Sequence, residues 1–304
     1  MSSGSSPFSR LDTVPVTGST QDDLRGVLTG PEAGSWPHLS ALRALRQTAG
    51  RGRSGRTWVT PDEGALLVSV VLRPLVPAEH LAWLPLLAGL AVRDALTSFV
   101  DDLPWQLGTK WPNDVVAVPK DPAVVAAVPG WAGTRKIAGV LSELVTAEPS
   151  GGRAHGRLAP DEVPAGRDEA PMVILGIGVN IAQEADDLPV AWAGSLRTLG
   201  AVDVDGKPAH AAVAEVVLNA IGHQLVRRLE QWEEACGDVD AGDGVLGSEL
   251  RAALTTLGQQ VSVQAPDGEL NGLAIDVTPA LVLRNQAGDT EVRAGDVSLV
   301  RVTG

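Results

Sequence analysis

Cysteine is almost absent from this sequence of 304 residues, which contains a single one, Cys236. One cysteine excludes an internal disulfide framework, and it excludes a zinc site built from a cluster of cysteines. So low a cysteine content also fits a reducing compartment. Hydrophobic residues make up 44% of the chain, which is typical of a globular protein with an ample core.

Long hydrophobic runs are lacking as well. The longest, residues 81–92, is too short to span a bilayer and is followed at once by Arg93 and Asp94. Residues 1–10 are rich in serine and lack the apolar core of a secretory signal. We therefore expect a soluble, cytoplasmic protein without a membrane partner.

Basic residues are in the minority, since 24 Lys and Arg against 37 Asp and Glu give a formal net charge of −13. A protein of this charge repels nucleic acid on average. Arg51, Arg53 and Arg56 nevertheless lie close together, separated by glycines and a serine. An ordinary run of charges forms a solvated surface loop, but a local basic patch on an acidic protein favours binding of a small anionic ligand.

The length predicts one large and one small domain. Ser19 is a plausible N-cap for a helix over 20–29. The apolar patterns predict strands at 38–47, 65–72, 136–145 and 172–181, and helices at 78–99 and 209–232. Residues 148–171 contain Gly, Pro and charges without any period, which predicts a mobile surface insertion.

Near the C-terminus the apolar segments become short and are separated by turn signals. Short strands are predicted at 261–263, 270–277, 281–283 and 295–302, with turn signals between them. These strands predict a small β-barrel, with a domain boundary near residues 247–257. We therefore expect two domains, 1–250 and 251–304.

The most informative segment runs from Gln47 to Trp58 and contains residues 50–56, Gly-Arg-Gly-Arg-Ser-Gly-Arg, here called the glycine–arginine loop. Its glycines permit close approach of the backbone to a ligand, and its guanidinium groups suit carboxylate and phosphate oxygens. A charge pair at 4 Å contributes only ~1 kcal/mol in water but ~4 kcal/mol at an effective dielectric of about 20. The loop can therefore stabilise a charged reaction centre if it excludes water. Gly/Arg runs also occur in protein tails that bind nucleic acid. This run is short and flanked by apolar strands, which favours an ordered loop at an active site.

Three further segments combine polar residues with glycine. In the turn Lys110-Trp-Pro-Asn-Asp114, the lysine suits a phosphate, the asparagine a base edge and the aspartate a hard cation, although Asp114 alone is as readily a turn cap. Lys136 begins a buried strand, where a lysine is uncommon without an anionic partner, unless it simply extends to solvent. In the segment 176–180, Gly-Ile-Gly-Val-Asn, the third glycine and following helix of a dinucleotide fingerprint are missing.

Together these segments resemble those of biotin protein ligases. Gly18-Ser19-Thr20, the glycine–arginine loop, 110–114, 136–143 and 176–180 follow one another in the order of that family, and residues 295–299 resemble the end of its small SH3-like domain. One such motif is weak, but five in order over most of the chain are specific. The resemblance implies an α+β fold. A mixed β-sheet flanked by helices, as in class II synthetases and lipoate ligases, would be followed by a C-terminal SH3-like β-barrel.

The resemblance also implies roles for individual residues. Biotin binding is expected of Ser19, Thr20, Gln47, Gly50, Arg51, Lys136 and Gly139, and ATP binding of Arg53, Arg56, Trp58, Lys110, Asn113 and Asn180. Lys136, Arg51 and Arg53 would be catalytic, because they neutralise two anionic reactants. Asp114 would hold Mg²⁺. Gln21 departs from the Asn that many relatives have after Ser-Thr, but it keeps the amide chemistry.

The implied reaction joins biotin and ATP in biotinyl-5′-AMP and then transfers biotin to a lysine of a biotin carboxyl carrier domain, from an acyl-CoA or pyruvate carboxylase. Some relatives carry an N-terminal helix-turn-helix domain. Because only about eighteen residues precede Ser19, we expect the monofunctional type, which does not bind DNA. The alternatives are a lipoyl or octanoyl ligase of the same superfamily, a non-catalytic biotin sensor and a Gly/Arg nucleic-acid module.

Overall fold

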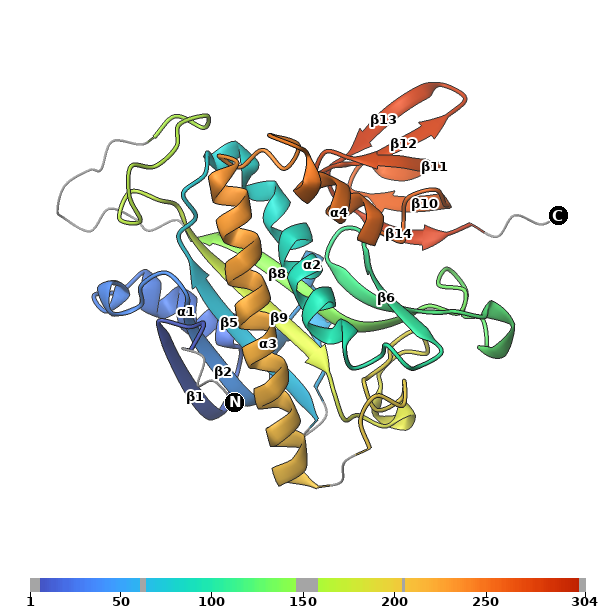
Figure 1. Cartoon of the computed structure of the whole chain (residues 1–304), viewed down its shortest axis with the longest axis horizontal. Helices are drawn as coiled ribbons and strands as arrows, with labels where there is room; N and C mark the ends of the chain where they lie inside the picture. The colour runs from blue at the N-terminus through green and yellow to red at the C-terminus, as the bar shows by residue number, and fades with distance from the viewer. Residues whose placement is uncertain (1–5, 61–63, 146–157, 204–205, 301–304) are drawn as a thin grey trace.

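The computed structural model describes residues 6–60, 64–145, 158–203 and 206–300 (Figure 1). These residues form a large mixed β-sheet with helices, followed by a smaller antiparallel sheet. The predicted α+β fold with a small C-terminal β-domain is thus confirmed. None of the helices in these ranges has both the length and the apolar character needed to cross a membrane.

The large sheet has seven strands in the order β1-β2-β5-β9-β8-β7-β6. Their bounds are β1 (Arg10–Thr17), β2 (Ser40–Gln47), β5 (Ala65–Leu72), β6 (Trp105–Lys110), β7 (Asp114–Pro119), β8 (Arg135–Val145) and β9 (Met172–Asn180). β1 and β2 are parallel, and all other neighbours are antiparallel. β5 is buried over almost its whole length, as its continuous apolar run predicts.

Helices cover both faces of this sheet. α2 (Leu84–Thr97) and α3 (Lys207–Glu234) cross one face, and α1 (Thr20–Leu28) packs on the other (Figure 1). Successive side chains of a strand point to opposite faces of the sheet, so the hydrophobic core is divided into one cluster on each face. Val70 of β5 packs in the same cluster as α2 and α3, whereas its neighbour Val71 packs in the smaller cluster around α1.

The helix α4 (Val245–Ala253) leads into the smaller sheet, whose strands lie in the order β13-β12-β11-β10-β14. Their bounds are β10 (Gln260–Ala265), β11 (Gly268–Val277), β12 (Leu281–Asn285), β13 (Gly288–Val292) and β14 (Asp296–Leu299). The Thr255 N–H donates to the Thr109 carbonyl at 2.8 Å, which ties this part of the chain to β6. The predicted boundary between residues 250 and 251 falls inside α4, and the two-domain division stays a prediction.

The structure differs from the sequence-based expectations in several places. The sequence does not predict β1, an edge strand that tolerates Pro15 because one of its sides is unpaired. Nor does it predict β13. The helix expected over 78–99 is split into a 3-10 helix, η3 (Ala78–Trp83), and α2, with Pro85 in the first turn of α2, where no amide hydrogen is needed.

Of the expected insertion 148–171, residues up to 157 lie outside the described residues, and its mobility stays a prediction. The remainder is anchored to the large domain. The Arg167 guanidinium donates to the Glu233 carboxylate and, at 2.7 Å, to the Arg73 carbonyl, and the Glu79 N–H donates to the Pro160 carbonyl at 3.1 Å.

His38 makes the stability of this fold sensitive to pH. Burial is the main reason why its pKa falls to about 4, and the charges of Arg167 and Arg73 lower it further against the opposing effect of Glu233. Its Nδ1 also accepts the Arg73 N–H at 2.9 Å, which requires that nitrogen to be unprotonated. Since the unfolded chain binds a proton near pH 6.5, the unfolded state takes up more protons between about pH 6.5 and 4, and stability is lost as the pH falls through this range.

We expect the free energy of unfolding to decrease on acidification over this range, with His38 contributing up to about 3 kcal/mol. His38→Asn keeps an acceptor for the Arg73 N–H but does not titrate, so it should show a flatter pH dependence. Urea denaturation at several pH values measures this. Identical slopes for the two proteins would show that His38 does not cause the effect.

Candidate active site

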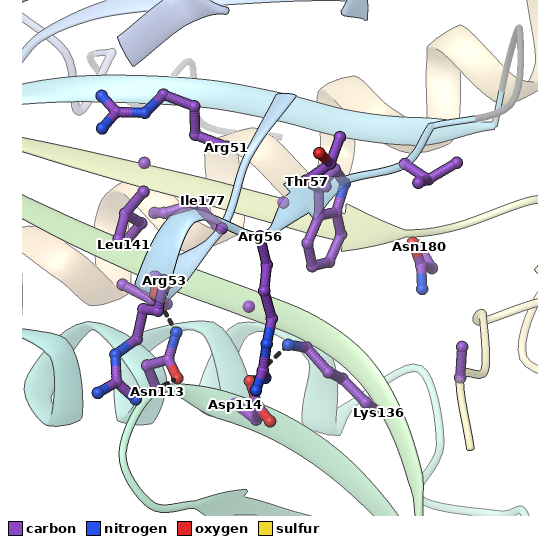
Figure 2. Close-up of a pocket in the computed structure, with 18 of the residues that line it drawn as sticks. Arg51, Arg53, Arg56, Thr57, Asn113, Asp114, Lys136, Leu141, Ile177 and Asn180 are labelled. Carbon is purple, nitrogen blue, oxygen red and sulfur yellow. Dashed lines mark hydrogen bonds and ion pairs between the residues drawn. The ribbon is translucent and has the colours of Figure 1, made fainter. Parts of the chain in front are cut away.

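A cavity of about 780 Å³ lies between the large sheet, the glycine–arginine loop and the C-terminal sheet. Figure 2 shows some of the residues that line it. The cavity is lined by every residue to which the sequence assigns biotin, ATP or metal binding except Gly50, namely Ser19, Thr20, Gln47, Arg51, Arg53, Arg56, Trp58, Lys110, Asn113, Asp114, Lys136, Gly139 and Asn180. Segments far apart in the sequence therefore converge on one site. Whether each of these residues binds the assigned ligand stays a prediction.

The glycine–arginine loop forms a small hairpin at the cavity. β3 (Gly50–Arg51) pairs antiparallel with β4 (Thr57–Trp58), and the short 3-10 helix η2 (Arg53–Gly55) joins them. A Cβ on Gly50 would lie 2.6 Å from the Trp58 carbonyl oxygen, so a larger residue does not fit. In this structure Gly50 shapes the hairpin and does not line the cavity.

Glycines of two adjacent strands allow the Trp58 indole to lie against the sheet. Gly139 of β8 pairs with Gly178 of β9. A Cβ on Gly178 would lie 2.7 Å from the indole Cε2, and one on Gly139 would lie 3.0 Å from its Cζ3. The two glycines therefore make room for an aromatic side chain on the floor of the cavity. The indole Nε1 is buried without a hydrogen-bond partner.

One end of the cavity is polar and uncharged. The Thr20 N–H donates to Gln47 Oε1 at 2.7 Å, and the Thr20 hydroxyl lies 2.7 Å from that of Ser69. Gln21 is 4% exposed, and its Nε2 has no hydrogen-bond partner. This end therefore offers several buried donors and acceptors to a small polar ring. The sequence analysis missed Ser69, although a serine within a buried apolar strand is a signal of this kind.

The other end of the cavity is cationic. Lys136 Nζ lies 2.6 Å from Asp114 Oδ1 and 5.4 Å from the centroid of the Trp58 ring. Lys110 is 7% exposed, and its Nζ donates to the Val297 carbonyl at 2.6 Å. Burial lowers the pKa of Lys110, against the opposing effect of Asp114. Two lysines thus face a region where an anion would be strongly stabilised.

The three arginines of the loop have different surroundings. Arg53 is the least well paired: its Nη1 lies 3.5 Å from both Asn113 Oδ1 and the Gly295 carbonyl, and burial lowers its pKa. Arg51 Nη1, by contrast, lies 3.0 Å from an oxygen of Asp22 and 3.1 Å from one of Glu143. Its side chain extends away from Lys136 (Figure 2). Arg53 is therefore the loop arginine best placed to receive an anion, and Arg51 anchors the loop.

Arg56 connects the loop to the C-terminal sheet. Its guanidinium forms a two-point ion pair with the Asp296 carboxylate, with Nη1 3.0 Å from Oδ1. Asp296, Val297 and Ser298 of β14 also line the cavity. The C-terminal sheet thus contributes a wall of the site, which sequence reasoning missed because only folding brings β14 beside the loop.

Both asparagines of the site hydrogen-bond to the backbone of neighbouring segments. Asn113 Nδ2 donates to the Val140 carbonyl at 2.5 Å. Asn180 Nδ2 donates to the Gly194 carbonyl at 2.9 Å, and its Oδ1 accepts from Gln183 Nε2 at 3.2 Å. Their predicted contacts with adenine stay predictions.

Two tryptophans that the sequence analysis did not single out stand at the cationic end. Trp131 and Trp192 stack with ring centroids 4.5 Å apart and ring planes 3° from parallel. Lys110 Nζ lies 4.2 Å from the centroid of the Trp131 ring. Both rings line the cavity, so this end joins cations to flat apolar surfaces, as a nucleotide requires.

Comparison with known proteins agrees with this geometry. Residues 15–157 match the biotin/lipoate A/B protein ligase family. The biotin–[acetyl-CoA-carboxylase] ligase of Mycobacterium tuberculosis is 31% identical over 304 residues, covering 97% of this chain and 91% of that protein. One of the same name from Paracoccus denitrificans is 29% identical, covering 92% of this chain and 97% of that protein.

Among solved structures, the Aquifex aeolicus biotin protein ligase in complex with biotin and ATP has a TM-score of 0.64 and 25% identity, over 97% of this chain and 100% of that chain. Similarity therefore extends over nearly the whole length in both sequence and structure. The chain belongs to the biotin protein ligase family.

Proposed function

We propose that this chain is an ATP-dependent biotin–protein ligase, which makes biotinyl-5′-AMP and transfers biotin to a lysine of a carrier domain. One observation carries the proposal: a single cavity joins an uncharged polar end to a cationic end. A ring with urea-like hydrogen bonding suits the first end, and a nucleotide phosphate suits the second. The names of the relatives and the biotin and ATP bound in the Aquifex aeolicus structure support it.

Biotin would bind with its ureido ring at Thr20, Gln47, Ser69 and Gln21, whose groups can complement its N–H and C=O. Its aliphatic tail would run along apolar side chains of the cavity such as Leu141 and Ile177. The carboxylate would then lie near Lys136. Binding would therefore place the reacting group at the cationic end.

The first half-reaction brings together two anions. A carboxylate oxygen of biotin attacks the α-phosphorus of ATP, and pyrophosphate leaves with the electrons of the broken P–O bond. Lys136, Lys110 and Arg53 would reduce the repulsion and stabilise the charge that develops on pyrophosphate. Their effect is largest when water is excluded, which the glycine–arginine hairpin and β14 would do together.

Mg²⁺ would accompany ATP. Two carboxylates that could bind Mg²⁺ line the cavity, those of Asp114 and Asp296. Each of them is already paired with a cation, which limits its capacity to bind the metal. No cluster of three or more His, Cys, Asp or Glu side chains that could hold a metal occurs among residues 6–60, 64–145, 158–203 and 206–300. Mg²⁺ needs only one or two carboxylates when phosphate oxygens and water complete its shell. We therefore place Mg²⁺ on the phosphates, with Asp114 as a protein ligand once Lys136 engages an anion.

The acceptor would be a biotin carboxyl carrier domain. The two relatives named above are ligases for acetyl-CoA carboxylase. An acyl-CoA carboxylase is thus the first candidate, and pyruvate carboxylase is a second. The cytoplasm, where such carboxylases are made, is the proposed location.

A lipoate-specific ligase is the alternative within the family. The dithiolane ring of lipoate has no N–H or C=O, so it would leave the buried N–H groups of the Gln21 amide, which have no partner in the protein, unpaired. Such unpaired groups cost about 1–3 kcal/mol each, which favours biotin. Pyrophosphate release with biotin and with lipoate separates the two: we expect biotin to be preferred by at least about a hundredfold, and equal rates would contradict the proposal.

Gly178→Ala tests the floor of the cavity. The added methyl group would displace the Trp58 indole into the space proposed for the ligands, and overpacking of this kind costs about 1–3 kcal/mol. We expect the KM for ATP or biotin to rise about tenfold or more. Gly166→Ala is the matched control, since nothing lies within 4 Å of its added Cβ. Unchanged kinetics for Gly178→Ala would contradict this account of the floor.

A further inference from the structure

A second cavity of about 450 Å³ adjoins the first. The two share a wall, since Arg53, Asn113 and Leu141 line both of them. The remaining walls come from η3 and the start of α2, from β8, and from the C-terminal sheet around the turn between β11 and β12. The second cavity therefore meets the first from between the two sheets, at this shared wall.

The outer end of this cavity is exposed. Ala82 of η3 is exposed, and so are the side chains of Glu79 and Glu291, which are 54% and 53% accessible. Arg293 also stands there, with its Nη2 3.9 Å from Glu291 Oε2. The inner end is closed by Arg53, whose contacts to Asn113 and the Gly295 carbonyl are both 3.5 Å long. The cavity thus runs from solvent to a weakly held guanidinium group.

We propose that this second cavity is the route by which the acceptor lysine of the carrier domain reaches the acyl group. The inference rests on the proposed function. Biotin and the nucleotide would occupy the first cavity together, so a third reactant needs its own approach to the bond between them. A lysine has a long unbranched stem that can reach into a narrow space while its own backbone stays outside.

The charges along the route suit this reactant. At the outer end the two carboxylates of Glu79 and Glu291 outnumber the one cation, Arg293, and attract an ammonium ion. Arg53 at the inner end lowers the pKa of an approaching amine and so favours its neutral, nucleophilic form. The neutral amine gives its electron pair to the acyl carbon of the adenylate, and the bond between that carbon and the phosphate oxygen breaks, with its electrons leaving on AMP. The amine proton passes to water. Arg53 would thus act in both half-reactions.

Ala82→Trp tests the route by filling its outer end at a residue that does not itself line the first cavity. We measure two steps separately: biotin-dependent release of pyrophosphate, and transfer from the preformed adenylate to a purified biotin carboxyl carrier domain, followed by its mass shift. Adenylate formation should stay within about twofold of wild type, while transfer should slow at least tenfold. Ala212→Trp on the exposed side of α3 is the matched control and should change neither step.

A second variant tests the charges. Glu79→Gln combined with Glu291→Gln should raise the KM for the carrier domain several-fold at low salt, with little change in adenylate formation. Unaltered transfer in Ala82→Trp would overturn the proposal, and so would equal loss of both steps, because the cavity would then not be a separate route. A wild-type protein that forms no adenylate would instead overturn the proposed function itself.

Discussion

Replacing Lys136 with methionine is expected to slow biotin-dependent pyrophosphate release by about 10²- to 10³-fold, which is typical for the loss of one group that stabilises transition-state charge. Methionine is unbranched and only one atom shorter, and it lacks both the charge and the N–H donors. In the structure Lys136 is held by Asp114 at 2.6 Å and faces the cavity beside Trp58. A positioned cation of this kind should affect the rate more than substrate binding, so the loss should appear mainly in kcat.

Two comparisons make this result specific. Lys120→Met removes an exposed lysine whose Nζ donates to the Asp101 carbonyl, far from the cavity, and should leave the rate unchanged. Lys136→Met also leaves Asp114 without its partner, so its melting temperature must be measured and kinetics recorded well below it. A stable Lys136→Met protein with wild-type activity would remove the lysine from the reaction.

Arg53→Met is expected to lower activity by a similar factor while leaving stability unchanged or slightly higher. The two variants differ in stability because Lys136 has a close ion-pair partner, Asp114, whereas Arg53 has only long contacts. Arg53 has lost much of its hydration, which lowers its pKa, and its two protein contacts are 3.5 Å long. A partly buried charge without a good partner weakens the folded state, and a shorter, apolar side chain removes that cost. Its benefit would appear only when an anion binds.

Thermal unfolding with and without ATP checks this directly. Wild type should gain more stability from ATP than Arg53→Met does, although the variant without ligand is at least as stable. Arg284→Met is the control, because that arginine pairs with Asp289 on the surface of the small sheet, away from the cavity. If Arg53→Met were strongly destabilised and still active, Arg53 would be a structural residue.

The sequence predicts most of the polar residues that line the cavity. Glycine at 178 and lysine at 136 are unusual inside buried strands, and such residues are informative because packing alone does not favour them. The strands β5, β8 and β9 that carry or support them were also predicted nearly to the residue, from their continuous apolar runs. These local signals are strong since they depend on neighbours along the chain.

What the sequence does not predict depends on distant partners. The role of Arg51 as an anchor follows from Asp22 and Glu143, which reach it only through the pairing of β8 and the placement of α1. Trp131 and Trp192 lie in irregular segments without a periodic pattern, so nothing indicates that they stack. The strand β1 escapes notice because it is an edge strand, with exposed residues at about half of its positions.

The C-terminal sheet gives the clearest example of such a long-range effect. Lys110, Arg53 and Arg56 contact Val297, Gly295 and Asp296, which follow them by well over a hundred residues. The small sheet is therefore tied to residues that line the cavity and is not a separate appendage. It forms one wall of both cavities, next to the place where a carrier domain would have to dock.

Biotin and ATP must bind side by side in one cavity to react, and formation of the adenylate tests this most directly. Purified protein would be incubated with ATP and Mg²⁺, with and without biotin, and both the released pyrophosphate and the protein-bound product would be measured by mass spectrometry. We predict pyrophosphate only when biotin is present, together with a bound species of the mass of biotinyl-5′-AMP. Pyrophosphate release that is absent, or that is the same without biotin, would contradict the account.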